Sequence, residues 1–173
     1  MKQKVCSRCE KPRRIWARGL CKSCDIAVNP KKYMIEKKMV ERKKKSESVS
    51  VLKKKLDEVY SLYIRNKHAD KDGLVECYTC EVKKPIKEMQ NGHFYSRAKN
   101  STRWEDDNCR PQCYSCNVAK KGNYIVYTEK MQQELGEEKY QALKDLANST
   151  FQVKSLWLQE QIKHYKQLLS QWN

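Results

Sequence analysis

Apolar side chains between residues 51 and 67 recur at the spacing of one face of a helix. They are Leu52, Leu56, Val59, Tyr60, Tyr63 and Ile64. We predict an amphipathic helix over residues 51–67 that packs on the core of the protein. The Asp-Lys-Asp-Gly sequence at 70–73 then predicts a turn, and residues 74–76 predict a short strand.

More helices are predicted toward the end of the chain. Residues 129–135 and 137–147 have helical character, and Gly136 between them is typical of a helix stop. A heptad-like stripe of about two repeats follows, and its members are Leu158, Ile162, Tyr165, Leu169 and Trp172. This last helix either folds back on its own domain, which is the commoner use of such a helix, or mediates a dimer.

The charge of the chain is concentrated near its N-terminus. Residues 1–55 hold 19 Lys and Arg against 5 Asp and Glu, so they supply +14 of the formal net charge of +16. The lysine-rich stretch 31–45 predicts a basic helix or a partly disordered arm, and residues 46–50 predict a linker. Such a basic excess favours the phosphate backbone of a nucleic acid as partner. A membrane surface is a poorer partner, because the stretch lacks a clean face of Trp, Phe and Leu.

Eight of the nine cysteines fall into Cys-x-x-Cys pairs. No apolar signal segment follows Met1 and no apolar run reaches transmembrane length, so we expect a cytoplasmic protein with reduced thiols. Each set of two pairs then predicts one structural zinc, giving two per chain, and a pair of unpaired redox thiols is the alternative for the first set. The sets are Cys6, Cys9, Cys21 and Cys24, and Cys77, Cys80, Cys113 and Cys116. The ninth, Cys109, is expected to be a small core residue.

Three polar residues between or beside the second set point to chemistry. His93 has a side chain that titrates near neutral pH and can take a proton from water. Asn117 follows a zinc ligand and offers a carboxamide oxygen that suits a hard cation such as Mg²⁺ or Mn²⁺. Asn108 can hydrogen-bond the loop that orients the imidazole. A structural role for His93 is the alternative, but four cysteines already fill the zinc shell.

The ordered set Cys77-x-x-Cys80, Gly92-His93-Phe94, Asn108 and Cys113-x-x-Cys116-Asn117 resembles the zinc-bound HNH (ββα-metal) endonuclease motif. The resemblance to the NinG (Rap) family of lambdoid-phage recombination nucleases is closer and covers about residues 52–140. Its further matching positions are Ile64-Arg65, Thr102-Arg103-Trp104, Gln112, Lys120, Gly122-Asn123, Tyr127 and Leu135-Gly136. This resemblance implies a structure-specific endonuclease that acts on branched recombination intermediates such as D-loops and Holliday junctions.

The resemblance also implies roles for individual residues. His93 takes the position of the general base, Asn117 that of the metal ligand and Asn108 that of the loop brace. The chain departs from the broader HNH pattern at Gly92, where an acidic metal ligand usually precedes the histidine. The nearby carboxylates that can substitute are Glu88, Glu105, Asp106 and Asp107. In the other reading, His93 binds the cation itself and the base is unidentified.

We therefore expect a mostly helical α+β protein. Its small zinc-stapled ββα-metal (HNH, or His-Me finger) core would carry flanking helices and an N-terminal zinc knuckle. The expected domains are a knuckle at 1–28, a basic helix and linker at 29–50, the nuclease core at 51–127 and C-terminal helices at 128–173. The expected DNA-binding residues are Arg13, Arg14, Arg18, Arg97, Arg103, Lys120 and Lys121.

Two functions remain open at this point. The first is a divalent-metal-dependent endonuclease for branched DNA, expected as a homodimer because a resolvase cuts two opposed strands. If the chain is phage-encoded, it would act in the host cell cytoplasm, with phage or host recombination proteins as candidate partners. The second is a non-catalytic zinc protein that binds nucleic acid as a recombination or regulatory factor.

Overall fold

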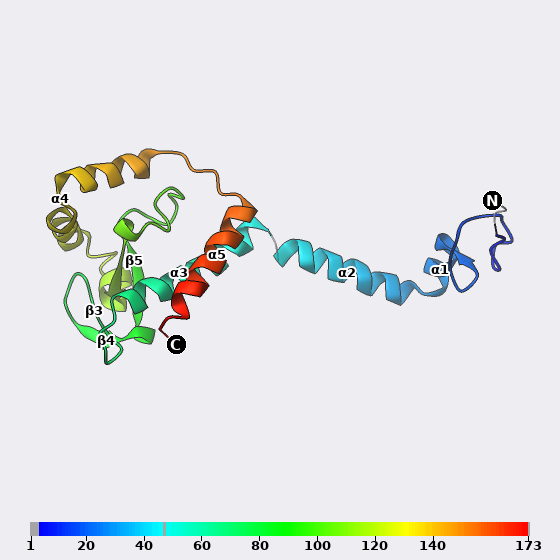
Figure 1. Ribbon diagram of the computed structural model, residues 1–173, viewed down its shortest axis with the longest axis horizontal. Coiled ribbons are helices and arrows are strands. Elements are labelled where there is room, and N and C mark those ends of the chain that lie inside the picture. Colours follow the sequence, from blue (N-terminus) through cyan, green and yellow to red (C-terminus); the bar gives the residue numbers. More distant parts are fainter. Residues whose placement is uncertain (1–3, 47, 173) are drawn as a thin grey trace. The chain divides into compact units, whose positions relative to one another are not determined.

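The computed structural model describes residues 4–46 and 48–172. The chain forms two compact units, Met1–Glu47 and Ser48–Asn173. The fold is mixed α+β with about 55% of the residues in helices, as expected for a mostly helical α+β protein (Figure 1).

The first unit contains a small hairpin followed by two helices. Strand β1 (Ile15–Ala17) pairs antiparallel with β2 (Leu20–Cys21), and the helices are α1 (Lys22–Val28) and α2 (Pro30–Ser46). Gly19 lies in the tight turn between the strands with φ of 76°, a conformation in which glycine carries no steric penalty. Residues 31–45 are thus helical, which decides between the helix and the disordered arm.

The boundary between the two units, after Glu47, falls within the predicted linker at 46–50, although helices occupy both ends of that stretch. Helix α2 continues to Ser46, and α3 (Val49–Lys67) begins only three residues later. Ser48 is the N-cap of α3, and its backbone carbonyl accepts the N–H of Leu52 at 2.9 Å. Ser48 makes no side-chain capping bond, and Ser46 and Ser50 lie inside the two helices, so the weak helix preference of serine does not decide the structure here. Glu47 lies outside the described residues.

A buried carboxylate joins α1 to α2 within the first unit. Asp25 is fully buried and accepts hydrogen bonds from the hydroxyl of Tyr33, from Asn29 Nδ2 at 3.0 Å and from Arg18 at 3.1 Å. The Tyr33 hydroxyl, followed by the Arg18 guanidinium, holds the pKa of Asp25 below its ordinary value even though burial opposes this. These bonds fix the start of α2 against the cysteine-bearing segment.

The second unit is built on two packed helices, α3 and α5 (Ser155–Leu169). Tyr60 and Tyr165 meet edge to face with ring centroids 4.9 Å apart. The buried residues of this cluster are Leu52, Leu56, Tyr60, Ile64, Trp104, Cys109 and Leu158. The helix predicted at 51–67 is confirmed, and the C-terminal helix covers its own unit.

Two short antiparallel hairpins follow α3. Strand β3 (Leu74–Glu76) pairs with β4 (Lys83–Pro85), and β5 (Met89–His93) pairs with β6 (Cys109–Cys113). The predicted strand at 74–76 is confirmed. Single helical turns, η1 (Ile86–Glu88), η2 (Asp106–Asn108) and η3 (Ser115–Ala119), lie beside these strands. The region from 89 to 119 thus contains two antiparallel strands, joined through the loop and turn at 94–108, and a short helix after the second strand.

Helix α4 (Tyr124–Asn148) wraps the β5–β6 hairpin and is bent at Gly136, whose φ of 69° and ψ of 171° are not helical. The predicted helix stop at Gly136 is thus confirmed, although the first segment begins at Tyr124 and not at 129. The buried residues of this wall are Phe94, Tyr127, Met131 and Leu143. Helix α4 also crosses position 127, where we had divided the core from the C-terminal helices.

Candidate active-site cleft and metal clusters

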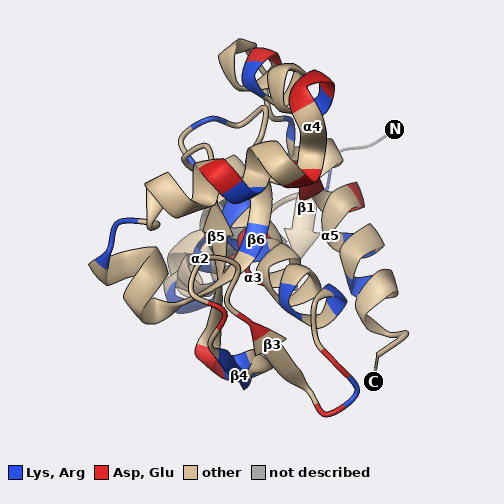
Figure 2. Cartoon of the chain, turned by 90° about the vertical axis from the view of Figure 1, so that its left-hand side faces the viewer, with Lys and Arg blue, Asp and Glu red and all other residues tan. Residues whose placement is uncertain are grey.

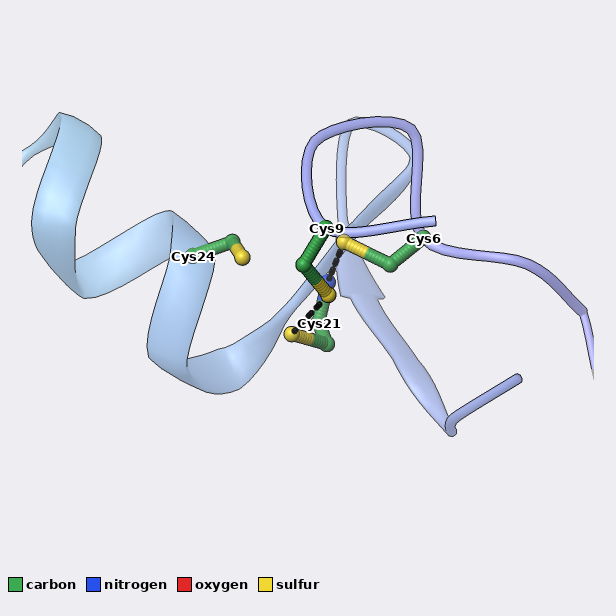
Figure 3. Close-up of side chains that lie close together, drawn as sticks. All are labelled: Cys6, Cys9, Cys21 and Cys24. Carbon is green, nitrogen blue, oxygen red and sulfur yellow. Dashed lines mark hydrogen bonds between the residues drawn. The ribbon is translucent and has the colours of Figure 1, made fainter. Parts of the chain in front are cut away.

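The first four cysteines bring their sulfur atoms together (Figure 3). Cys6 and Cys9 come from the loop before β1, Cys21 ends β2 and Cys24 lies on α1. All four Sγ atoms lie within 4.8 Å of one another, and those of Cys9 and Cys21 are 3.9 Å apart. The second cluster has the same form: its four Sγ atoms also lie within 4.8 Å, with Cys80 and Cys113 at 3.7 Å.

These separations suit zinc. Four sulfurs at about 2.3 Å from a tetrahedral zinc lie about 3.8 Å from one another, whereas a disulfide needs about 2.05 Å. All nine cysteines are free thiols. Each cluster can therefore hold one zinc ion.

Hydrogen bonds to sulfur prepare one thiolate in each cluster. The backbone N–H of Cys21 donates to Cys6 Sγ at 3.2 Å and lowers the pKa of Cys6 to about 6. In the second cluster burial opposes ionisation of Cys77, yet the N–H of Cys113, at 3.3 Å, and others lower its pKa to about 6. The Cys21 thiol and burial raise the pKa of Cys24 to about 12. Each set thus contains one thiol that ionises readily and another whose ionisation is opposed. A bound divalent cation would stabilise all the thiolates together.

Gly92 lies where the side chain of Gln112 covers the hairpin. A Cβ at Gly92 would stand only 2.8 Å from Gln112 Cδ and 2.9 Å from its Cγ. Gln112 is fully buried, and its Nε2 donates to Thr79 Oγ1 at 3.0 Å and to the Gly122 carbonyl at 2.7 Å. The hairpin therefore has no room for the acid that usually precedes the histidine of the HNH pattern.

A cleft of about 520 Å³ opens between α3, β5, the loop after β5 and η3. His93 and Asn117 both line it, although 24 positions separate them in the sequence. Strand β5 places His93 at its last residue, and the turn η3, which starts just after Cys113, places Asn117. The described residues that line the cleft include Asp57, Arg65, Gln90, Asn91 and Arg97.

The His93 ring is held by a backbone carbonyl. Its Nε2 lies 3.0 Å from the carbonyl oxygen of Arg103. Since a carbonyl only accepts, Nε2 carries the proton and the neutral ring keeps its lone pair on Nδ1. Burial lowers the pKa of His93 below its ordinary value of 6.5, while the Arg103 carbonyl and the Asp57 carboxylate oppose this shift. The neutral imidazole is therefore the favoured form at pH 7.

Asn108 is fully buried and braces the loop between His93 and Arg103. Its Nδ2 donates to the carbonyls of Tyr95 and Thr102 at 3.0 and 2.8 Å, and its Oδ1 accepts the N–H of Tyr95 at 2.7 Å. The side chain spans both ends of this loop and is outside the residues that line the cleft.

Asp57 of α3 holds the side chains of Arg103 and Trp104, at the far end of the loop that Asn108 braces. Its carboxylate accepts Nε and an Nη of Arg103 at 2.9 and 2.5 Å, and Nε1 of Trp104 at 3.0 Å. The remaining Nη donor of Arg103 binds the Arg97 carbonyl at 2.9 Å. Asp57 thus fixes the residue whose carbonyl orients His93.

Three carboxamides converge on the cleft from β5 and η3. Asn117 Nδ2 donates to Gln90 Oε1 at 2.7 Å, which leaves Asn117 Oδ1 without a donor among the described side chains. Asn91 Oδ1 is buried and has no hydrogen-bond partner among the described residues. Unsatisfied oxygen atoms of this kind fit a hard divalent cation.

The cations expected to bind DNA fall into different environments. Arg97 lines the cleft and is exposed, as are Lys120 and Lys121 in the turn after η3. Arg103, in contrast, donates its hydrogen bonds to the Asp57 carboxylate and to the Arg97 carbonyl. In the first unit Arg13 and Arg14 are exposed, while the exposed Arg18 is ion-paired to Asp25 at 3.1 Å.

The carboxylates named from the sequence as substitutes for an acid at 92 lie outside the cleft lining. These are Glu88, Glu105, Asp106 and Asp107. Among the described lining residues the carboxylate is Asp57, which sequence reasoning missed. The signal was its helical spacing: positions 57, 60, 61 and 65 all face the cleft from α3.

Comparison with known proteins defines the family. The model of the family described as NinG, Bacteriophage Lambda NinG protein, matches residues 1–173. The chain therefore belongs to the NinG family, and this membership suggests a function related to phage recombination. The search of curated proteins found no match, nor did the search of solved structures. None of the described helices combines the length and apolar character needed to span a membrane.

Proposed function

We propose that the protein is a divalent-metal-dependent endonuclease of the HNH type that cuts branched recombination intermediates such as Holliday junctions and D-loops. The observation that carries this proposal is the shared cleft of His93 and Asn117. The cleft is built on two antiparallel strands and a short helix that are closed by a cysteine cluster. A protein that only binds nucleic acid has no need of this combination.

In this proposal His93 is the general base. With the proton of Nε2 directed at the Arg103 carbonyl, Nδ1 accepts a proton from the attacking water. The lowered pKa keeps that lone pair free at neutral pH. Asn108 holds the loop that supplies the carbonyl, and so acts as a positioning residue.

Asn117 and Asn91 would hold the divalent cation, Mg²⁺ or Mn²⁺, through their carboxamide oxygens. When bound, such a cation would stabilise charge on the phosphate and on the leaving 3′ oxygen. Gln90 orients Asn117 through its 2.7 Å hydrogen bond. Arg97 at the edge of the cleft would contact a phosphate beside the scissile bond, with Lys120 and Lys121 farther along the strand.

The Arg103 guanidinium has a different role in this proposal from the phosphate contact expected from sequence. Its donors bind Asp57 and the Arg97 carbonyl, so it holds the backbone that orients His93. Asp57 and Arg103 are thus positioning residues. The basic first unit would supply long-range attraction to DNA through exposed cations such as Arg13 and Arg14.

The test is cleavage of labelled four-way junctions, flaps and linear duplexes in Mg²⁺ or Mn²⁺. His93→Ala should lower the cleavage rate by at least about a hundredfold, as expected for loss of a general base, and keep its bound zinc and its affinity for junctions. His68→Ala is the matched control, because His68 is exposed and outside the cleft. Wild-type protein that binds junctions without metal-dependent scission would refute the proposal.

One observation favours a second function, a non-catalytic zinc protein that binds nucleic acid. The carboxylate among the described cleft residues, Asp57, is already occupied by Arg103 and Trp104. The cation site would then consist of neutral carboxamides, which bind Mg²⁺ weakly. The same assay decides between the two functions, because the second predicts binding in EDTA and in Mg²⁺ alike with no cleavage products.

A homodimer, proposed for cutting opposed strands, is tested by sedimentation on junction DNA.

A further inference from the structure

A second hollow, of about 570 Å³, lies on the other side of the loop that carries Arg103. The loop at 100–106, α3, the end of α4 and α5 enclose it. Five aromatic side chains line it: Tyr63, Trp104, Phe151, Trp157 and Tyr165. Neither cysteine cluster nor the proposed chemistry at His93 uses this hollow.

The aromatic rings of the hollow do not cover one another. Trp104 and Trp157 have centroids 5.5 Å apart with planes at 52°, and Phe151 meets Trp157 edge to face at 5.1 Å. Tilted rings of this kind leave faces on which a flat group can stack. Phe151 is 37% exposed, so one wall of the hollow is open to solvent.

One carboxylate in the hollow is free to accept hydrogen bonds. Asp106 is already engaged by the hydroxyls of Tyr60 and Tyr63 at 3.0 and 3.3 Å and by Lys67 at 2.6 Å. Glu105, beside it, is exposed and has no ion-pair partner among the described residues. Ser101 Oγ, on a lining residue, is buried with no partner among the described residues. The hollow therefore presents acceptors for N–H donors along its aromatic walls.

Two lysines at the rim of the hollow favour one kind of hydrogen-bond donor over another as its occupant. Lys53 Nζ donates to Asn100 Oδ1 at 2.9 Å, and Lys99 Nζ donates to the Ala147 carbonyl at 2.8 Å. Both partners are neutral, so among the described residues neither lysine has an ion-pair partner, and both positive charges lie next to lining residues. A cationic side chain of a protein partner would be repelled at this rim, whereas the phosphates on either side of a nucleobase would be attracted.

We propose that this hollow binds one unpaired nucleobase of the DNA substrate. The base would stack on the half-buried ring of Trp157, beside Phe151, and donate its exocyclic amino group to Glu105, which favours adenine, cytosine or guanine over thymine. Ser96 and Arg97 line the cleft, while Asn100, Ser101 and Trp104 line the hollow, so one loop borders both. The inference rests on the proposed function and gives it a substrate class: branched DNA with an unpaired base near the cut.

The experiment measures binding in EDTA, where no cleavage occurs. A duplex with one extrahelical adenine is compared with the same duplex carrying an abasic residue or a thymine at that position. We expect about tenfold tighter binding of the adenine bulge than of the abasic bulge, the size of one stacked base, with thymine between them. Quenching of tryptophan fluorescence should accompany only the bulges that carry a base.

Phe151→Ala and Glu105→Gln test the walls of the hollow, with matched controls. Phe151→Ala should abolish most of the preference for a base, and Glu105→Gln should abolish the preference for adenine over thymine. Leu156→Ala and Asp107→Asn remove an exposed apolar group and a nearby exposed acid, both outside the hollow, and should change neither preference.

Equal affinity of the wild-type protein for adenine and abasic bulges would overturn the inference. So would quenching by arginine amide with no response to the bulged base, which would assign the hollow to a cationic side chain. Both outcomes differ from failure of the proposed function, since loss of cleavage leaves these metal-free affinities unchanged. Conversely, cleavage of a junction without base preference would keep the nuclease and remove the base site.

Discussion

The two cysteine clusters share a donor set but hold very different amounts of protein. In the first unit only eleven residues separate the two cysteine pairs, and a hairpin connects them. In the second unit thirty-two residues separate the pairs, and these carry His93 and Asn108. The three hydrophobic clusters of the described residues all lie in the second unit. The same kind of cysteine cluster can thus be the main element that holds a small unit together, or one cross-link within a unit that also has a hydrophobic core.

The two units also differ in charge. Residues 1–47 hold 16 Lys and Arg against 5 Asp and Glu, a net charge of +11, whereas residues 48–173 hold 21 against 16, a net charge of +5. In the second unit acidic and basic positions interleave along α4 and over β3 and β4 (Figure 2). In the proposed function, the first unit would attract DNA by its charge and the second unit would hold the residues of the cleft.

The largest expected effect comes from removing one cysteine ligand from each cluster. Cys6→Ser should lose one zinc and the fold of residues 4–28, because binding of a structural zinc contributes about 10–16 kcal/mol and this unit has little core besides. Cys77→Ser should lose one zinc but keep the packing of α3 on α5. Zinc analysis with hydrogen exchange checks both variants. Persistent amide protection over 4–28 in Cys6→Ser would contradict the difference.

A smaller effect is expected at the hairpin. Gly92→Ala should destabilise the second unit by about 1–3 kcal/mol, because the new Cβ overlaps the Gln112 side chain. Denaturant unfolding measures this, and the first unit should keep its zinc. In a Gln112→Ala background the same change should cost much less. An equal cost in both backgrounds would show that Gln112 is not the obstacle.

A still smaller effect is expected at Asp57. Asp57→Asn should slow cleavage about tenfold, close to 1.4 kcal/mol, because the Arg103 carbonyl that orients His93 is less firmly held. Since the Asp57 charge raises the pKa of His93, its loss should also move the acid limb of the rate profile to lower pH. Glu58→Gln, a neighbouring exposed acid, is the control. A slower rate with an unmoved acid limb would reduce Asp57 to a purely structural role.

The smallest effect is in the pH dependence of the wild-type protein. The cleavage rate should fall as pH drops, with a midpoint below the ordinary histidine value of 6.5, because burial lowers the pKa of His93. The unfolded chain takes up this proton at higher pH than the folded chain, so the contribution of neutral His93 to stability is present above 6.5 and lost below it. Rates and unfolding free energies between pH 5 and 8 check both statements. A midpoint above 6.5 would refute the assignment.

Local pattern was enough to predict much of the fold. The spacing of Leu56, Tyr60 and Ile64 gave α3, and Gly136 gave the bend in α4. The linker predicted at 46–50 holds the boundary between the units but is too long, because helix propensity is only a weak local preference and Ser46 and Ser50 both lie in helices.

The candidate site was predicted less completely. His93 and Asn117 were named because motif order places them, but Asp57 and Asn91 reach the cleft only through packing of α3 on the hairpin. The engagement of Arg103 by Asp57 involves positions 46 apart in the sequence, and no periodicity reports such a pair. Likewise, the lack of an acid at position 92 has its cause twenty residues later, in Gln112.

The bend at Gly136 lets one segment serve two walls. A straight helix of 25 residues would run about 37 Å in one direction and pass the hairpin at a single point. Bent as it is, its first arm ties Glu134 to Tyr78 and Arg110, beside the cysteine cluster. Its second arm packs Leu143 on Phe94, next to the catalytic candidate, and receives Lys99 at the Ala147 carbonyl. The two arms of α4 on either side of Gly136 therefore connect the region of the second cysteine cluster with the loop that follows His93.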